Sequence, residues 1–177
     1  TPQLRSPNVQ RGGYYYDAVL WAAQKALPAG MSDTLFGSER CLHQAQIVTF
    51  LWRAAGSPEP KQLSTFGDVP ADAYYAKAVA WAVENGITDG TSEQRLHPHH
   101  LHEAHGVTFL SRAAKANTAS GNSNFADVDA NAYYASAVKW AVDNGITNGI
   151  SSSLFGPDSS CTRAQIVTFL YRMYQGK

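Results

Sequence analysis

The segment "IVTFLYR" at residues 166–172 decides the fold, because the chain contains it three times. Its other copies are "IVTFLWR" at 47–53 and "GVTFLSR" at 106–112. A second motif recurs at the same offset of roughly 60 residues. Its copies are "YYYDAVLWA" (14–22), "YYAKAVAWA" (74–82) and "YYASAVKWA" (133–141). Self-similarity at a fixed period indicates that one structural unit is repeated along the chain.

Each repeat predicts two helices joined by a loop. In the first helix of the second repeat, Ala78, Val79 and Trp81 follow helical spacing. Gly86, and Gly145 in the next repeat, are predicted to end these helices as left-handed residues, with the following isoleucine in the apolar contact of a Schellman motif. The segment at 166–172 supplies the apolar face of the second helix.

One such helix pair cannot enclose its own apolar face, whereas three packed pairs can. We therefore expect one all-α domain over residues 1–177, with three helix-loop-helix repeats packed as a pseudo-threefold helical bundle. The repeats are predicted at 1–60, 61–119 and 120–177. The first is degenerate, because it reads "KALPAG" where the others read "NGITDG" and "NGITNG", and it lacks their Phe-x-Asp-Val motif.

The bulk composition excludes several functions. Fourteen basic and 14 acidic residues balance, which argues against nucleic acid or an anionic membrane as the main partner. No apolar run approaches the roughly 18 residues needed to cross a bilayer. Cys41 and Cys161 are too few for a disulfide scaffold and are expected to be two separate buried thiols, although one long-range bridge is the alternative. A phosphate loop, Gly-x-Ser-x-Gly and Cys-x-x-Cys are all missing, so no enzyme is predicted.

The third repeat carries an arginine where a helix begins. Thr162-Arg163-Ala164-Gln165 fits the capping box, in which Thr162 caps the helix and Gln165 reaches back. A cation in the first turn faces the positive end of the helix dipole, which is unfavourable by itself. A guanidinium beside helical N–H groups suits an anion. The alternatives are a solvated arginine or one paired with Asp158.

The order Phe-x-Asp-Val, aromatic-Ala, helix, Gly-Ile-x-x-Gly, then Phe-x-Pro-Asp and Thr-Arg-Ala-Gln resembles the S-layer homology (SLH) family. The third repeat shows it as "FADV", "YYASAV", "GITNG" and "LFGPDSSCTRAQ". The resemblance implies a helical pseudo-trimer that anchors bacterial surface proteins to cell-wall polysaccharide. The expected ligand is a secondary wall polymer ending in a pyruvylated amino sugar, held in grooves between repeats.

The resemblance also implies ligand-binding residues, with Arg163 pairing with the ketal carboxylate. Asp127 and Asp68 match the Phe-x-Asp-Val aspartate, and they could instead cap the following turn. Tyr134 and Tyr75 stand where the family usually has Trp, and they could be core aromatics. Gly149 and Gly90 would let ligand approach the backbone, or they could serve only turns.

The other two repeats lack the arginine. The first has His43-Gln44-Ala45-Gln46 and the second has His102-Glu103-Ala104-His105. A carboxylate at this position should repel an anionic ligand, so we expect at most one intact anion site, centred on Arg163.

The segment "LHPHHLHEAHG" at 96–106 is rich in histidine. His102 and His105 are three apart at a helix start and can face one side. With His99 or His100 from the loop, they could bind Zn²⁺ or Ni²⁺, although the spacing is not His-Glu-x-x-His. The alternatives are untethered surface histidines, an adventitious metal site, or pH sensing near the groove.

Two functions from different classes follow. The first is a non-catalytic, extracellular module at the bacterial cell wall that binds the anionic secondary polysaccharide of a Gram-positive-type bacterium and holds the remainder of a larger surface protein. The alternative is a protein-interaction or metal-dependent assembly domain on an SLH-like scaffold, motivated by the two degenerate repeats. No resident cofactor is expected, and neither nucleic acid nor membrane insertion is predicted.

Overall fold

The computed structural model describes residues 9, 11–27, 38, 41–63, 66–90, 96, 101–118 and 123–175. The all-α prediction is confirmed, because this part of the chain forms six helices and only isolated β-bridges. The helices are α1 (Tyr16–Gln24), α2 (Gln44–Ala54), α3 (Ala76–Glu84), α4 (Glu103–Ala113), α5 (Ala135–Asp143) and α6 (Arg163–Gln175). Among the described residues, no helix has the length and apolar character that a bilayer crossing would need.

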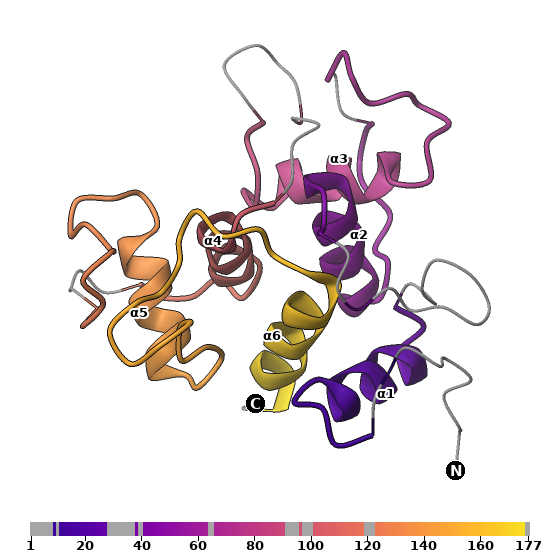
Figure 1. The fold of residues 1–177 in the computed structure, drawn as a ribbon. Helices are drawn as coiled ribbons and strands as arrows, with labels where there is room; N and C mark the ends of the chain where they lie inside the picture. Colours follow the sequence, from indigo (N-terminus) through magenta and orange to yellow (C-terminus); the bar gives the residue numbers. More distant parts are fainter. Residues whose placement is uncertain are drawn as a thin grey trace.

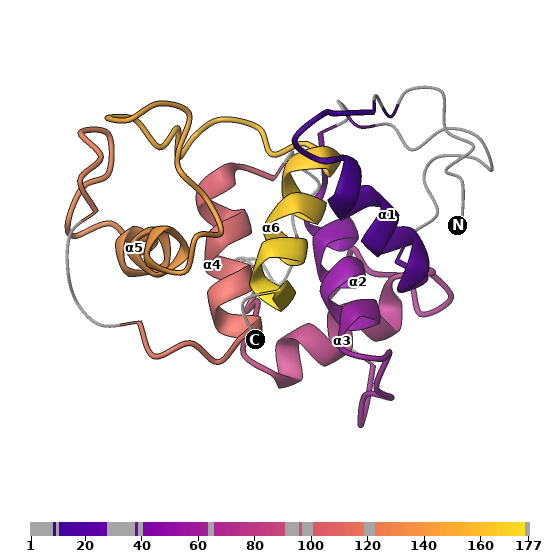
Figure 2. The same ribbon diagram turned by 90° about the horizontal axis from the view of Figure 1, so that it is seen from below.

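The helices pair between repeats. Each first helix packs against the second helix of another repeat: α3 against α2, α5 against α4, and α1 against α6. In the view of Figure 2, α2, α4 and α6 lie between α1 and α5. Figure 1 shows α6, near the C-terminus, beside α1. The pairings therefore close into a cycle that returns from the last repeat to the first, while the rotation relating the three repeats stays a prediction.

Three backbone hydrogen bonds form a closed ring between the repeats. The Leu42 N–H donates to the Cys161 carbonyl (3.0 Å), the Cys161 N–H to the Leu101 carbonyl (2.7 Å), and the Leu101 N–H to the Leu42 carbonyl (2.6 Å). Each residue is at most 1% exposed and lies just before the second helix of its repeat. Buried backbone N–H and C=O groups need hydrogen-bond partners. Here each of the three residues finds its partners in the other two repeats. The ring thus fixes how the second helices begin relative to one another.

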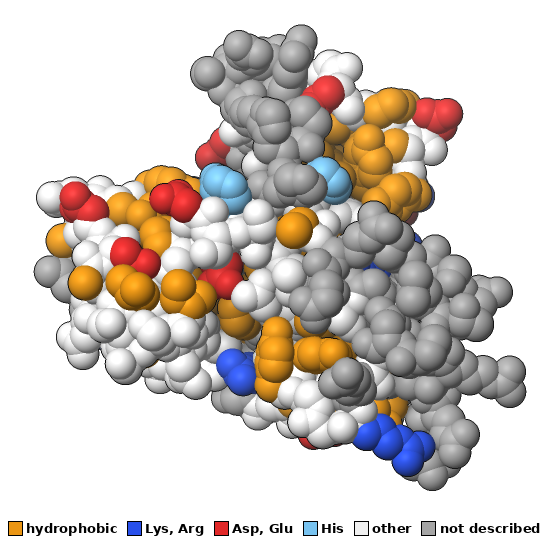
Figure 3. Space-filling view, viewed as in Figure 1, with side chains coloured by type: hydrophobic (Ala, Val, Ile, Leu, Met, Phe, Trp, Pro, Cys, Tyr) orange, Lys and Arg blue, Asp and Glu red, His pale blue; other side chains and the backbone are white. Residues whose placement is uncertain are grey.

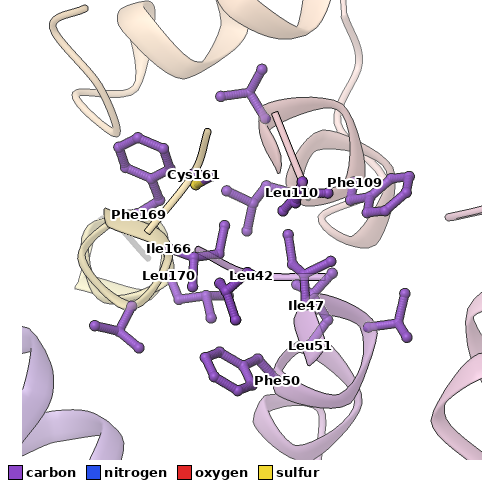
Figure 4. Packing of buried hydrophobic residues seen from close by; sticks show 14 of the residues in the cluster. Leu42, Ile47, Phe50, Leu51, Phe109, Leu110, Cys161, Ile166, Phe169 and Leu170 are labelled. Carbon is purple, nitrogen blue, oxygen red and sulfur yellow. The ribbon is translucent and has the colours of Figure 1, made fainter. Parts of the chain in front are cut away.

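The core lies where the apolar faces of α2, α4 and α6 meet (Figure 4). Ile47, Leu51, Leu110, Ile166 and Leu170 are each at most 1% exposed. Fully burying one side chain of this size contributes about 1.5–3 kcal/mol. The three copies of the repeated segment, at 47–53, 106–112 and 166–172, therefore supply the central core of the domain.

The predicted Schellman motifs are confirmed. Gly86 has φ 65° and donates to Val83, while the Ile87 N–H donates to the Ala82 carbonyl at 2.8 Å. Gly145 and Ile146 repeat this geometry in the third repeat. In the first repeat Ala26 adopts φ 53° in the same place, and the Leu27 N–H closes the motif on Ala22 at 3.0 Å. The degenerate repeat therefore keeps the turn at the cost of a strained alanine.

Candidate functional site

The start of α6 is closed by the capping box predicted from the sequence. The Thr162 N–H donates to Gln165 Oε1 (2.7 Å), and the Gln165 N–H donates to Thr162 Oγ1 (3.2 Å). The Ala164 N–H donates to the carbonyl of Ser38, in the first repeat, at 3.1 Å. Protein groups therefore already use part of the helix N-terminus, so an anion would depend more on the side chains around it.

Arg163 is buried at the meeting point of three repeats. It is 4% exposed, and its guanidinium carbon lies over the ring of Phe50 in α2, 5.4 Å from the ring centre. Burial lowers the pKa of Arg163, and Tyr74 from the second repeat opposes that shift. A stacked guanidinium of this kind contributes about 0.5–2 kcal/mol. The alternative of a solvated arginine is therefore wrong, and any ligand must reach the guanidinium past its neighbours.

The exposed aromatic residues are the first tyrosines of the repeated pairs. Tyr74 is 63% exposed and Tyr133 is 59% exposed. Tyr75 and Tyr134 instead pack against the core at the N-caps of α3 and α5, as the core-aromatic alternative predicted. Each exposed ring stands edge-on to its neighbour, with centroids 5.0 Å apart for Tyr74–Tyr75. Sequence reasoning missed Tyr74 and Tyr133, because two adjacent aromatics give no sign of which one faces solvent.

The charges beside Tyr74 and Tyr134 differ. Burial raises the pKa of Tyr74, whereas the cations Arg53 and Arg163 act to lower it. Burial and Asp158 raise the pKa of Tyr134, with further acidic contributions from Asp127 and Asp129.

Figure 3 agrees with this difference, since acidic side chains appear over α5 and its flanking loops. Tyr133 is intermediate between Tyr74 and Tyr134. Burial and the neighbouring Tyr134 make the largest contributions to its raised pKa, and the smaller contributions of Arg112 and Asp158 have opposite directions. The charges that act on the hydroxyl are therefore cationic at Tyr74 and acidic at Tyr134.

The Phe-x-Asp-Val aspartates hold the loop that precedes the second helix. Asp127 Oδ1 accepts the N–H of Phe155 and Oδ2 accepts the N–H of Gly156, both at 2.8 Å. In the second repeat, both carboxylate oxygens of Asp68 accept the single N–H of Leu96, at 2.9 and 3.0 Å. Charge-assisted bonds of this kind are strong. The aspartates thus fasten a segment 28 or 29 residues away, and a ligand role for them stays a prediction.

Gly149 is required by packing inside the protein. Its φ is 77°, and an added Cβ would lie 2.6 Å from the Leu154 carbonyl oxygen and 2.7 Å from the Phe125 ring. The space beside its Cα is therefore filled by protein, not open to a ligand. Gly90 has φ 71°, and its N–H donates to Thr88 Oγ1 at 3.2 Å. Both glycines adopt turn conformations that favour glycine, and a role of Gly90 in ligand approach stays a prediction.

Two of the four histidines proposed as metal ligands lie within the described residues. The rings of His102 and His105 are 5.8 Å apart, and His105 is 5.8 Å from the ring of Tyr133. His99 and His100 fall outside the described residues. Within the described ranges, no group of three or more His, Cys, Asp or Glu side chains could hold a metal ion. The four-histidine site stays a prediction.

Glu103 occupies the position in α4 that Arg163 occupies in α6, and it is 2% exposed. Gln165 Nε2 donates to its Oε1 at 2.5 Å. Burial raises the pKa of Glu103 from its ordinary 4.5 to about 7, and the Gln165 hydrogen bond only partly opposes this. The Glu103 carboxylate was expected to lie at a groove surface and repel an anionic ligand. It instead points into the protein, where its hydrogen bond with Gln165 ties the second repeat to the third.

The cysteines are separate thiols, as expected. Cys161 is buried in the backbone ring and Cys41 is half-buried, and neither forms a disulfide. Burial, followed by Glu103 and Cys41, raises the pKa of Cys161 far above its ordinary value. A thiol held protonated in this way is unreactive.

Comparison with known proteins agrees with the repeat pattern. Residues 65–101 and 124–167 each match one family model. That family is the S-layer homology domain. The two SLH segments fall in the second and third repeats and contain Asp68, Tyr74, Asp127 and Arg163. The first repeat is not among the matched residues, so the number of three SLH repeats stays a prediction.

Several relatives share this region. A surface-layer 125 kDa protein of Lysinibacillus sphaericus is 30% identical over 115 residues, which cover 64% of this chain and 10% of that protein. A cell surface protein of Thermoanaerobacter kivui is 49% identical over 49 residues, 28% of this chain and 6% of that protein.

An amylopullulanase of Thermoanaerobacterium thermosulfurigenes is 22% identical over 165 residues, 90% of this chain and 9% of that protein. The chain therefore spans a small fraction of each relative. The enzyme-named relative is similar to it only over that fraction.

Proposed function

We propose that this chain is a non-catalytic module that anchors a larger surface protein to the bacterial cell wall. The SLH matches and the relatives named as surface proteins indicate an extracellular location at the cell surface. The proposed partner is the secondary wall polysaccharide of a Gram-positive-type bacterium. Its proposed recognition feature is a carboxylate, as a pyruvylated amino sugar would supply.

One observation carries the choice of site, namely the exposed ring of Tyr74 with Arg53 and the buried Arg163 acting on its hydroxyl. The tyrosine is exposed and offers a ring face to a sugar, while Arg53 and Arg163 lie close enough to act on its hydroxyl. Arginine is suited to carboxylates because its planar fork donates two parallel hydrogen bonds. Tyr134 has three carboxylates in the same role. We therefore assign the anionic sugar to the Tyr74 side, with Arg163 reached once the ligand seats against the tyrosine.

Sedimentation with purified wall sacculi tests this function. The chain should sediment with intact sacculi and remain in solution after the secondary polymer has been removed from them. Tyr74→Ala should reduce the bound fraction several-fold, and Arg163→Lys should also reduce it, because an ammonium loses the bidentate geometry. Tyr133→Ala is the matched control, since its ring is similarly exposed but has the opposing charges of Arg112 and Asp158 in place of two arginines.

Sedimentation that does not depend on the polymer would refute the anchoring function. Equal losses in Tyr74→Ala and Tyr133→Ala would refute the assignment of the site. Because Arg163 is buried, circular dichroism must first show that its variant is folded. Tyr74→Ala tests the site even if that variant is not folded.

We also propose, as the second candidate, metal-dependent assembly through the histidine-rich segment. The observation that favours it is the 5.8 Å separation of the His102 and His105 rings. Two imidazoles at the start of one helix, on the N-cap residue His102 and on His105, are suitable ligands for Zn²⁺ or Ni²⁺. Metal analysis of protein purified without a nickel column, with size-exclusion chromatography before and after chelation, tests it. Metal-free protein whose size is unchanged by added zinc would refute it.

A further inference from the structure

A pocket lies at the end of the bundle where α4, α5 and α6 finish. Its volume is about 200 Å³. It is lined by Ala114, Ala116, Trp140, Asn144, Ile146, Arg172 and Met173. Arg163 is at the other end of α6, at its first residue. This pocket is therefore separate from the surface around Tyr74.

The lining combines one aromatic ring with several polar groups. Trp140 is half-buried and packs against the core with part of its ring. Asn144 Nδ2 donates to the Trp140 carbonyl at 2.8 Å, and Arg172 Nη1 donates to the Ile146 carbonyl at 3.0 Å. These bonds hold the amide and the guanidinium against the pocket wall. A guanidinium has five N–H donors, so this one can bind its carbonyl and still offer donors to a ligand.

The electrostatics of the pocket favour an uncharged ligand. Three helices end there, and the carbonyl end of a helix carries partial negative charge. Among the described residues, Arg172 is the one cation of the lining and no acidic residue lines the pocket. The guanidinium offsets the charge of the helix ends and also disfavours an amine. A group with both hydroxyl donors and acceptors, and with an apolar C–H face for the indole, fits these conditions. The volume is below that of drug-sized sites and suits a single ring.

The second repeat has the same polar frame but a different partner for its acid. Asn85, Trp81 and Arg112 make the same two hydrogen bonds there. At that place Glu84 accepts the N–H groups of Lys61 and Gln62, which draws the linker against the end of α3. Its counterpart Asp143 instead pairs with Lys139 of its own helix, at 2.5 Å. Among the described residues, the third repeat thus keeps the polar frame and pairs its acid with Lys139.

From this geometry we infer that the Trp140 pocket is a second saccharide site, which takes one neutral sugar ring with its C–H face on Trp140 and its hydroxyl or acetamido groups on Arg172 and Asn144. The inference is independent of the anchoring function. A chain that fails to bind sacculi could still bind a soluble sugar at this end.

Nuclear magnetic resonance titration of the full chain with N-acetylglucosamine, methyl glucoside and glucuronate tests the site. The neutral sugars should give saturable shifts of the Trp140 indole N–H and the Asn144 side-chain amide at millimolar concentrations. Trp140→Leu should weaken binding on the order of tenfold, as expected when an aromatic platform is lost. Trp81→Leu, at the matched position of the second repeat, should leave it unchanged.

Three results would overturn the inference. The first is wild-type protein whose Trp140 and Asn144 signals do not move in a saturable way. The second is equal weakening by Trp140→Leu and Trp81→Leu. The third is glucuronate binding as tightly as the neutral sugars. The wild-type shift map decides the matter even if Trp140→Leu does not fold.

Discussion

The substitution Gly106→Ala is expected to stabilise the domain. Gly106 lies inside α4 at the position where the other repeats carry Ile47 and Ile166. An added Cβ would meet Ile166 Cδ1 at 3.6 Å, Cys161 Sγ at 3.7 Å and Leu101 Cδ2 at 3.9 Å. These are ordinary van der Waals contacts, so the methyl group fits without movement of the core.

The magnitude follows from two contributions. Glycine in a helix interior costs about 0.8–1.0 kcal/mol relative to alanine. The new methyl group adds up to about 0.8 kcal/mol of apolar burial. Together they predict a gain of about 1–1.5 kcal/mol in the free energy of unfolding, which for a domain of this size raises the Tm by about 3–6 °C.

Urea unfolding followed by far-ultraviolet circular dichroism measures this change, with the m-value expected to stay constant. Gly67→Ala is the control, because its Cβ would have no atom within 4 Å and the third repeat has Ala126 there. It should gain only about 0.5 kcal/mol, through the unfolded chain. Gly106→Ile should be less stable than Gly106→Ala, since its additional carbons would overpack the core around Ile166, Cys161 and Leu101. Overpacking of this kind lowers stability by about 1–3 kcal/mol. A loss of stability in Gly106→Ala would refute the packing argument.

Three further changes can be measured with the same unfolding assay. Ala26→Gly should raise stability by about 0.5–1 kcal/mol, because glycine removes the steric cost of the left-handed conformation; an unchanged midpoint would contradict this. Asp127→Asn should lower stability by about 1.5–3 kcal/mol, because an amide offers one oxygen where the carboxylate accepts two backbone N–H groups; a variant as stable as wild type would show that the loop is held by other contacts. The raised pKa of Glu103 means that the folded state holds a proton that the unfolded state releases between pH 4.5 and about 7, so wild-type stability should fall across this window by up to about 3 kcal/mol. Glu103→Gln should remove that part of the slope, leaving the histidine contribution, and parallel curves for the two proteins would refute the assignment.

The features predicted correctly from the sequence are those made by neighbouring residues. The Schellman turns and the Thr162–Gln165 capping box involve partners no more than five residues apart, and each single helix is a local structure as well. Apolar spacing and cap residues encode such features directly.

The features that the sequence did not reveal join residues that are far apart in the chain. Arg163 is covered by Phe50 from the first repeat and lies near Tyr74 from the second. Asp127 binds a loop almost 30 residues further along the chain, and Glu103 turns inward to Gln165. No local pattern specifies these partners, because they are distant in sequence and meet only in the folded domain. The exposed tyrosines were missed because two adjacent aromatics do not show which one faces solvent.

The closed cycle of helices explains how such similar repeats can differ in chemistry. The backbone ring through Leu42, Leu101 and Cys161 fixes the start of each second helix, so the first residue of that helix can vary while the frame persists. That residue is an amide at Gln44, a buried acid at Glu103 and a stacked cation at Arg163. Since the Arg163 site draws its guanidinium, aromatic wall and tyrosine from three different repeats, no excised repeat contains it. If the proposed function holds, the binding unit is the closed domain, and a repeat that has lost its own arginine still supplies a wall to the repeat that keeps one.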